Sequence, residues 1–145
     1  MADDLPHLGE ELITTAARVV RWVPKPTRIR LSLAAARILA RLEDNGPTRI
    51  SDLAGQERSS QPTITNHVKR LESAGLVERS PDATDARAWQ IRLTDSGHKE
   101  LADMRQAVGT SLEPYLAQMS QRERKALQDG INAMQRLISL DRLPE

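Results

Sequence analysis

The chain has 145 residues, 39% of them hydrophobic and 28% charged, with a net charge of +1 at pH 7, so we expect one folded domain and not a disordered segment. It contains no cysteine, which excludes disulfides, thiolate zinc sites and cysteine redox chemistry. It has no apolar run of about 18 residues and an acidic N-terminus unlike a signal peptide, so we expect a cytoplasmic protein without a membrane span.

The first predicted element is an amphipathic helix over about residues 8–23, where apolar side chains recur at helical spacing. Pro24 and Pro26 end it. Basic residues are concentrated in this part of the chain, since seven Lys or Arg and no acid lie between Arg18 and Arg41. Such a stretch is typical of a phosphate-binding surface or of a solvated helix face, and the sequence leaves both interpretations open.

Two shorter helices are predicted next. Ser32 can cap a helix whose apolar positions extend to Leu42, and the Asn-Gly-Pro sequence at 45–47 indicates a turn. A third helix follows, with Ile50, Leu53 and Ala54 on one side.

The stretch from 59 to 80, SSQPTITNHVKRLESAGLVERS, predicts a fourth helix that ends at Gly75. Ile64, Val68 and Leu71 share its buried face. Its outward residues are uncharged and mostly hydrogen-bonding at the front and cationic at the rear, namely Ser60 (as the N-cap), Gln61, Pro62, Thr63, Thr65, Asn66, Lys69 and Arg70. A recognition helix places such front residues on base edges, whereas the rear residues suit phosphates. An ordinary surface helix would also fit the pattern.

Two strands directly after this helix favour the recognition-helix interpretation, because a helix-turn-helix followed by a β-hairpin is a winged one. They are predicted at residues 76–80 and 88–93, with PDATDAR between them. We expect Arg87 to enter a narrow minor groove and the carboxylate of Asp85 to hold its side chain. The alternative is a solvent-exposed ion pair of little energetic value. Trp89 is expected to pack at the base of the wing, and contact with DNA is the alternative.

Helical periodicity returns from Thr94 to the end of the chain, with Ser120 and Glu123 forming a capping-box pattern for the last helix. The predicted order is therefore ααααββαα, a mainly α fold with a small β-wing (α+β). Within a single domain over 1–145, we assign residues 31–95 to a winged helix-turn-helix lobe and residues 5–28 and 96–143 to a helical dimerisation region. The terminal helices carry more apolar face than a monomer of this size would readily bury, although packing on their own domain is the alternative.

The segments SQPTITNHVKRLESAGLVER and DARAWQIRLTDSG resemble the MarR family of winged helix-turn-helix regulators. The family pattern Asp-x-Arg, five residues, then Leu-Thr-x-x-Gly is present as Asp85, Arg87, Leu93, Thr94 and Gly97. The resemblance covers about residues 8–140 and implies an obligate homodimer with intertwined terminal helices, which binds double-stranded DNA. A two-fold dimer has half-sites about 34 Å apart on a pseudo-palindromic operator. Asn66 departs from the family, in which Arg is common at this position.

The resemblance also implies a repressor that a small, frequently aromatic acid ligand releases from DNA. Arg21, Trp22 and Arg28 could line its site, because an aromatic ring and guanidinium groups suit an organic anion. Core packing of Trp22 and solvation of the two arginines are the alternative.

Catalysis, a metal site and cofactors are not expected. His7, His67 and His98 lie on separate elements without liganding neighbours, and no phosphate loop, nucleophile elbow or metalloprotease motif is present. We therefore expect a sequence-specific DNA-binding transcriptional regulator that represses as a dimer. The alternative is a winged-helix protein-interaction adaptor without specific DNA binding.

Overall fold

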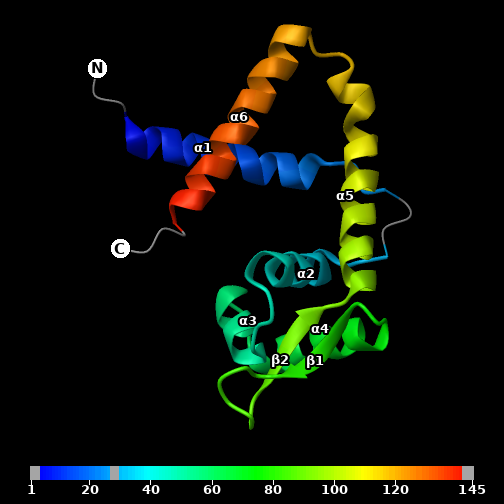
Figure 1. Cartoon of the computed structure of the whole chain (residues 1–145). Helices are drawn as coiled ribbons and strands as arrows, with labels where there is room; N and C mark the ends of the chain where they lie inside the picture. The colour runs from blue at the N-terminus through cyan, green and yellow to red at the C-terminus, as the bar shows by residue number, and fades with distance from the viewer. Residues whose placement is uncertain (1–3, 27–29, 142–145) are drawn as a thin grey trace. The chain divides into compact units, whose positions relative to one another are not determined.

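The structure is a computed structural model that describes residues 4–26 and 30–141. Over this part of the chain it contains six helices and one two-stranded antiparallel sheet (Figure 1). The elements are, in order, α1 (Leu5–Trp22), α2 (Leu33–Asn45), α3 (Ile50–Gln56), α4 (Gln61–Ser73), β1 (Val77–Pro81), β2 (Trp89–Leu93), α5 (Asp95–Leu116) and α6 (Gln121–Leu140). The predicted fold class and element order are confirmed.

The chain forms two compact units. The winged unit comprises residues 25–108, and the helical unit comprises residues 1–24 and 109–145. α5 belongs to the winged unit up to Val108 and to the helical unit from Gly109 onward. The two units are described separately below.

The hydrophobic core of the winged unit is built by α2, α3, α4, the hairpin and the start of α5. Its buried members are Ala35, Ile38, Leu39, Leu42, Leu53, Ala54, Ile64, Val68, Leu71, Leu76, Val77, Ile91 and Leu101. β1 and β2 pair in antiparallel register from Val77 opposite Leu93 to Pro81 opposite Trp89. Thr48 adds a single bridge, because its N–H donates to Ile91 O (3.0 Å) and its carbonyl oxygen accepts from the Ile91 N–H (2.9 Å).

Three serines begin helices as the sequence predicts. The Ser32, Ser60 and Ser120 hydroxyls accept from backbone N–H groups three residues on, at 3.1, 3.3 and 3.2 Å. The capping box at Ser120 is complete, because its N–H donates to Glu123 Oε2 at 2.7 Å. α1 begins earlier than predicted, because the Asp4 carboxylate accepts from the His7 N–H at 3.2 Å and caps it.

The junction of the hairpin with α5 explains the Leu-Thr-x-x-Gly pattern physically. Gly75 ends α4 with φ +74°, and the Leu76 N–H donates to Leu71 O at 2.9 Å. The Thr94 hydroxyl donates to Gly75 O at 2.6 Å, which ties the start of α5 to that turn. At Gly97 a Cβ would lie 2.1 Å from Leu76 O, so only glycine allows this approach.

The helical unit exposes its apolar residues. No described residue of α1 or α6 is buried. The large apolar side chains exposed on these helices are Leu5, Leu8, Ile13, Val19, Val20, Trp22, Leu127, Ile131, Met134, Leu137, Ile138 and Leu140. Trp22 makes an edge-to-face contact with Tyr115, with ring centroids 4.9 Å apart. For the described residues, no helix combines the length and hydropathy that crossing a bilayer would require.

Candidate nucleic-acid interface

α4 presents its polar side to solvent. Ile64, Val68 and Leu71 are buried in the core and fix the rotation of the helix about its axis. Thr65 is half-buried, and the other residues predicted for recognition are exposed: Ser60, Gln61, Pro62, Thr63, Asn66, Lys69 and Arg70. The Ser60 and Thr63 hydroxyls lie 2.8 Å apart and hydrogen-bond to each other. The front of α4 therefore offers amide and hydroxyl groups on a rigid, outward-facing surface.

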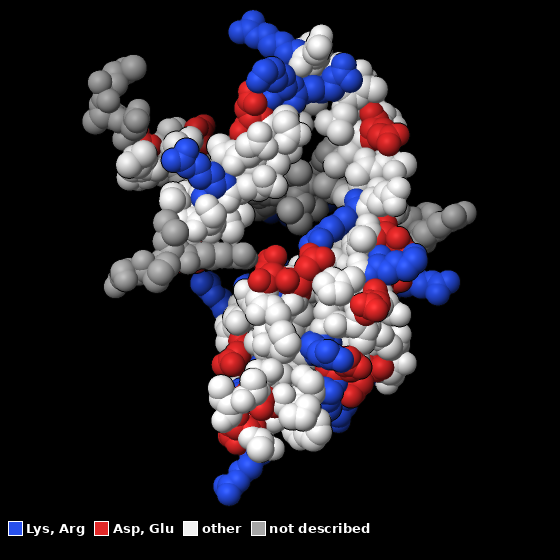
Figure 2. All heavy atoms as spheres, in the orientation of Figure 1, with Lys and Arg blue, Asp and Glu red and all other residues white. Residues whose placement is uncertain are grey.

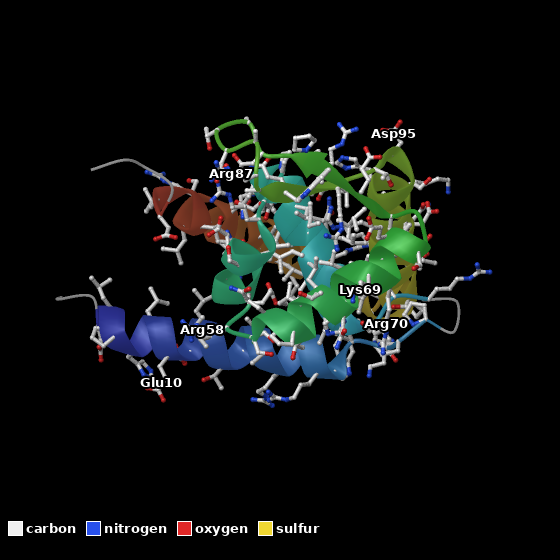
Figure 3. The ribbon with its side chains drawn as sticks, turned by 90° about the horizontal axis from the view of Figure 1, so that it is seen from below. Glu10, Arg58, Lys69, Arg70, Arg87 and Asp95 are labelled. Atoms are coloured by element: carbon white, nitrogen blue, oxygen red, sulfur yellow. The ribbon has the colours of Figure 1, made fainter. Side chains whose placement is uncertain are left out.

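The cations predicted for phosphate and groove contacts are exposed and have no carboxylate partner among the described residues. Lys69 and Arg70 lie on α4, and Arg87 lies in the loop between β1 and β2 (Figure 3). Figure 2 shows a basic side chain at the lower tip of the face that it draws. Acids and bases are otherwise interspersed on the face drawn in Figure 2, so no large single-signed patch is present on it.

The wing loop is organised by Asp82, whose side chain is only 3% exposed. Its carboxylate accepts from Arg49 Nε (2.6 Å), from the N–H and hydroxyl of Thr84 (both 2.8 Å), from the Asp85 N–H (3.2 Å) and from Gln90 Nε2 (3.2 Å). The hydrogen bond from the Arg49 guanidinium, with those from Thr84, holds the pKa of Asp82 far below its usual range, against the effect of burial. The same ion pair raises the pKa of Arg49. Asp82 thereby ties the wing to the start of α3.

Asp82 is not among the residues that the sequence analysis predicts for this site. The Asp-Ala-Thr sequence at 82–84 is typical of an Asx-turn, and this signal could have identified the bonds to the loop backbone. The ion pair with Arg49 joins residues 33 positions apart, so no local pattern indicates it.

Asp85 contacts the backbone of Arg87 and not, as predicted, its guanidinium group. Its carboxylate accepts from the backbone N–H of Arg87 at 2.9 Å, and its carbonyl accepts from the Ala88 N–H at 3.0 Å. No ion pair joins the Asp85 carboxylate and the Arg87 guanidinium in the part of the chain that the structure describes. Asp85 therefore shapes the turn, and the Arg87 side chain is left to extend from it.

The prediction that Trp89 packs at the base of the wing is wrong. Trp89 is 57% exposed, whereas Ile91, two residues further along the same face of β2, is fully buried. Trp89 pairs with Pro81 at the outer end of the ladder, beyond the reach of the core. Apolar residues do alternate along β2, but the core covers only the inner end of this strand.

The turn between α3 and α4 is attached to α2 by a carboxylate. The Glu57 side chain is only 6% exposed and accepts from Arg37 Nε at 2.9 Å and from Arg41 Nε at 2.6 Å. Arg41 Nη2 also donates to Gln56 O at 3.1 Å. Two arginines of the basic stretch therefore fix the helix-turn-helix internally, which neither interpretation of that stretch anticipated.

The residues predicted for a ligand site are only partly described. Arg21 is exposed, and Arg28 lies outside the described residues. Trp22 is 53% exposed and contacts the ring of Tyr115. Trp22 also lines a hollow of about 330 Å³ on α1 with Thr15, Arg18 and Val19. Among residues 4–26 and 30–141, no three His, Asp or Glu side chains are arranged to hold a metal ion.

Comparison with known proteins relates these features to regulators. Residues 31–89 match the MarR family model. The chain is 25% identical over 111 residues to the HTH-type transcriptional regulator YfiV of Bacillus subtilis, covering 77% of this chain and 69% of YfiV. It is 32% identical over 79 residues to the HTH-type transcriptional repressor IacR of Pseudomonas putida, covering 54% of this chain and about half (47%) of IacR.

A solved structure shares the fold over almost the whole chain. It is an S. aureus MepR mutant bound to an oligodeoxyribonucleotide, with a TM-score of 0.62 and 22% sequence identity. The superposition covers 90% of this chain and 96% of MepR.

Proposed function

We infer that this chain belongs to the MarR family of winged helix-turn-helix transcriptional regulators, and on that premise we propose that it binds double-stranded DNA sequence-specifically as a homodimeric repressor. The observation that carries the proposal is the exposed polar side of α4, which three buried residues hold in one orientation. Because its target is chromosomal DNA, we place the protein in the cytoplasm.

In the proposed complex, α4 lies in the major groove and its first residues meet base edges. Gln61 and Asn66 each offer an amide that can both donate and accept, which suits adenine, and Thr65 can contact a thymine methyl group. Lys69 and Arg70 meet phosphates further along the helix. Arg87 enters the adjacent minor groove from the wing, which Asp82 and the backbone bond to Asp85 hold in place.

We propose that a second copy of the chain covers the exposed apolar side chains of α1 and α6. Association through non-polar side chains removes them from water, which is the usual driving force for a permanent dimer. A two-fold dimer presents two α4 helices about one turn of duplex apart, roughly 34 Å, to a pseudo-palindromic operator.

Regulation by a ligand is the remaining part of the proposal. IacR is named a repressor, which supports the same sign of regulation here. We propose that a small organic anion, such as an aromatic acid, releases the protein from DNA, with the ring of Trp22 and the guanidinium of Arg21 contributing to its binding. MepR, whose structure was solved with an oligodeoxyribonucleotide, supports DNA as the partner of the shared fold.

The experiment selects bound fragments from a random DNA library and then measures affinity for the selected site and for a scrambled one. We expect the selected site to be a pseudo-palindrome that binds at least 1000-fold more tightly, on the order of the usual specificity ratio. Thr65→Ala and Asn66→Ala should each cost roughly 1–3 kcal/mol at particular base pairs, because they remove base contacts and no charge. Equal affinity for both DNAs would refute specific recognition, and capture of a protein partner without any DNA binding would favour an adaptor.

A further inference from the structure

The turn that connects α3 to α4 contains an arginine in a backbone conformation that normally belongs to glycine. Arg58 has φ +50° and is the one non-glycine residue with positive φ in residues 4–26 and 30–141. The Ser59 N–H donates to Ala54 O at 2.9 Å and the Arg58 N–H donates to Gly55 O at 3.1 Å. α3 therefore ends in the same hydrogen-bonding motif as α4, which uses Gly75 at the equivalent position.

The turn does not need the arginine side chain to form. Ala54 is buried, and the two hydrogen bonds of the motif involve only backbone atoms. The neighbouring carboxylate of Glu57 is bound by Arg37 and Arg41, so these bonds attach the turn to α2. A side chain with a Cβ destabilises the left-handed conformation, and glycine would relieve that cost. Strain of this kind persists where the surroundings impose it, and it is concentrated at binding sites.

Most arginines of the winged unit have carboxylate partners, and Arg58 does not. The arginines that pair with a carboxylate are Arg37, Arg41, Arg49, Arg79, Arg92 and Arg105. No described carboxylate pairs with the other described arginines of this unit, which are Arg30, Arg58, Arg70 and Arg87. Arg70 and Arg87 are already proposed to contact DNA, and Arg58 shares with them an exposed side chain that has no carboxylate partner among residues 4–26 and 30–141.

The position of Arg58 also fits a DNA backbone. In a helix-turn-helix the first helix crosses the backbone and the second lies in the major groove, so the turn between them lies at the edge of the groove. Figure 3 shows Arg58 beside the N-terminal end of α4, with Lys69 and Arg70 towards its other end. We propose that Arg58 is a phosphate-binding residue that extends the DNA contact to the front edge of the recognition helix; this rests on the proposed function.

The test is Arg58→Gly, because the proposal predicts opposite effects on folding and on binding. The glycine variant should have a Tm a few degrees higher than the wild type, since the strain is removed. Each phosphate contact contributes about 0.9 to the slope of log K against log salt, so a dimer with two copies should lose about 1.8 from the slope and roughly 30-fold in affinity at about 0.15 M salt. The loss should be equal on selected and scrambled DNA, because phosphates carry no sequence information.

Arg58→Lys is the matched control, because it keeps the charge and the backbone strain. It should retain most of the salt slope and show no gain in Tm. If Arg58→Gly binds DNA with the wild-type affinity and slope, or if it loses affinity for the selected site alone, the phosphate contact is refuted. Wild-type protein and Asn66→Ala are measured alongside: failure of the wild type to bind any DNA refutes the proposed function itself, whereas normal wild-type binding confines a negative result to Arg58.

Discussion

Substitution of two glycines of α5 by alanine should change stability in opposite directions. At Gly97 the added Cβ would lie 2.1 Å from Leu76 O and 2.8 Å from Leu93 Cδ1, whereas at Gly109 it would meet no atom within 4 Å beyond the adjacent residues and backbone of its own helix. To restore an ordinary contact at Gly97, the first turn of α5 must move by about 1 Å, and overpacking of this kind costs about 1–3 kcal/mol.

The movement also lengthens a hydrogen bond, because Leu76 O accepts from the Thr94 N–H at 3.2 Å. Loss of that bond would add about 1 kcal/mol. The higher helix propensity of alanine returns about 0.5–1 kcal/mol, so Gly97→Ala should be destabilised by about 1–3.5 kcal/mol in total. Gly109→Ala has only the propensity term and should be stabilised by about 0.5–1 kcal/mol.

The assay is urea unfolding followed by circular dichroism, with all variants at one protomer concentration, because association makes stability concentration-dependent. The free energy of unfolding should fall for Gly97→Ala and rise for Gly109→Ala. A Gly97→Ala protein as stable as Gly109→Ala would show that the close approach of α5 to Leu76 does not constrain the fold, and the physical explanation of the Leu-Thr-x-x-Gly pattern would be wrong.

The remaining predictions concern the wing and the dimer. Asp82→Asn should be less stable than the wild type at neutral pH, because Arg49 loses its counter-charge. A carboxylate whose pKa is depressed in the folded state stabilises the fold above its unfolded pKa of about 3.9. The difference in unfolding free energy between wild type and variant should therefore be constant above about pH 5 and shrink as the pH falls further. A difference in unfolding free energy that does not depend on pH would contradict the role of the charge. Ile138→Asp, on the apolar side of α6, should convert the proposed dimer to monomers in sedimentation velocity. Asn132→Asp, which adds the same charge beside the hydrogen-bonded Gln128, should leave the dimer intact. Dissociation of both variants, or of neither, would argue against this surface as the interface.

The sequence predicts local features of this molecule well, because they depend on residues close together in the chain. Ser60 caps α4 and Gly75 ends it, and both follow from hydrogen bonds within five residues. The buried face of α4 follows from helical periodicity alone. These features are the ones that position the recognition surface.

Features that depend on distant residues could not be predicted in this way. The bond between Arg49 and Asp82 joins α3 to the wing, and Glu57 binds two arginines of α2 that lie 16 and 20 positions earlier. In the sequence, a basic residue that forms an ion pair with a distant carboxylate cannot be distinguished from a basic residue that is available to contact DNA. The turn at Arg58 could not be predicted for a different reason. A left-handed backbone position is usually recognised in a sequence by its glycine, and this position holds an arginine.

Every buried residue in the described chain lies between Ala35 and Leu101. The side chains proposed to hold a second copy of the chain and those proposed to contact DNA are therefore subject to separate constraints. Substitutions in α1 and α6 can accumulate without loosening the packing beneath α4. Conversely, changes at a few exposed positions of α4 leave the residues that fix the rotation of this helix unaltered.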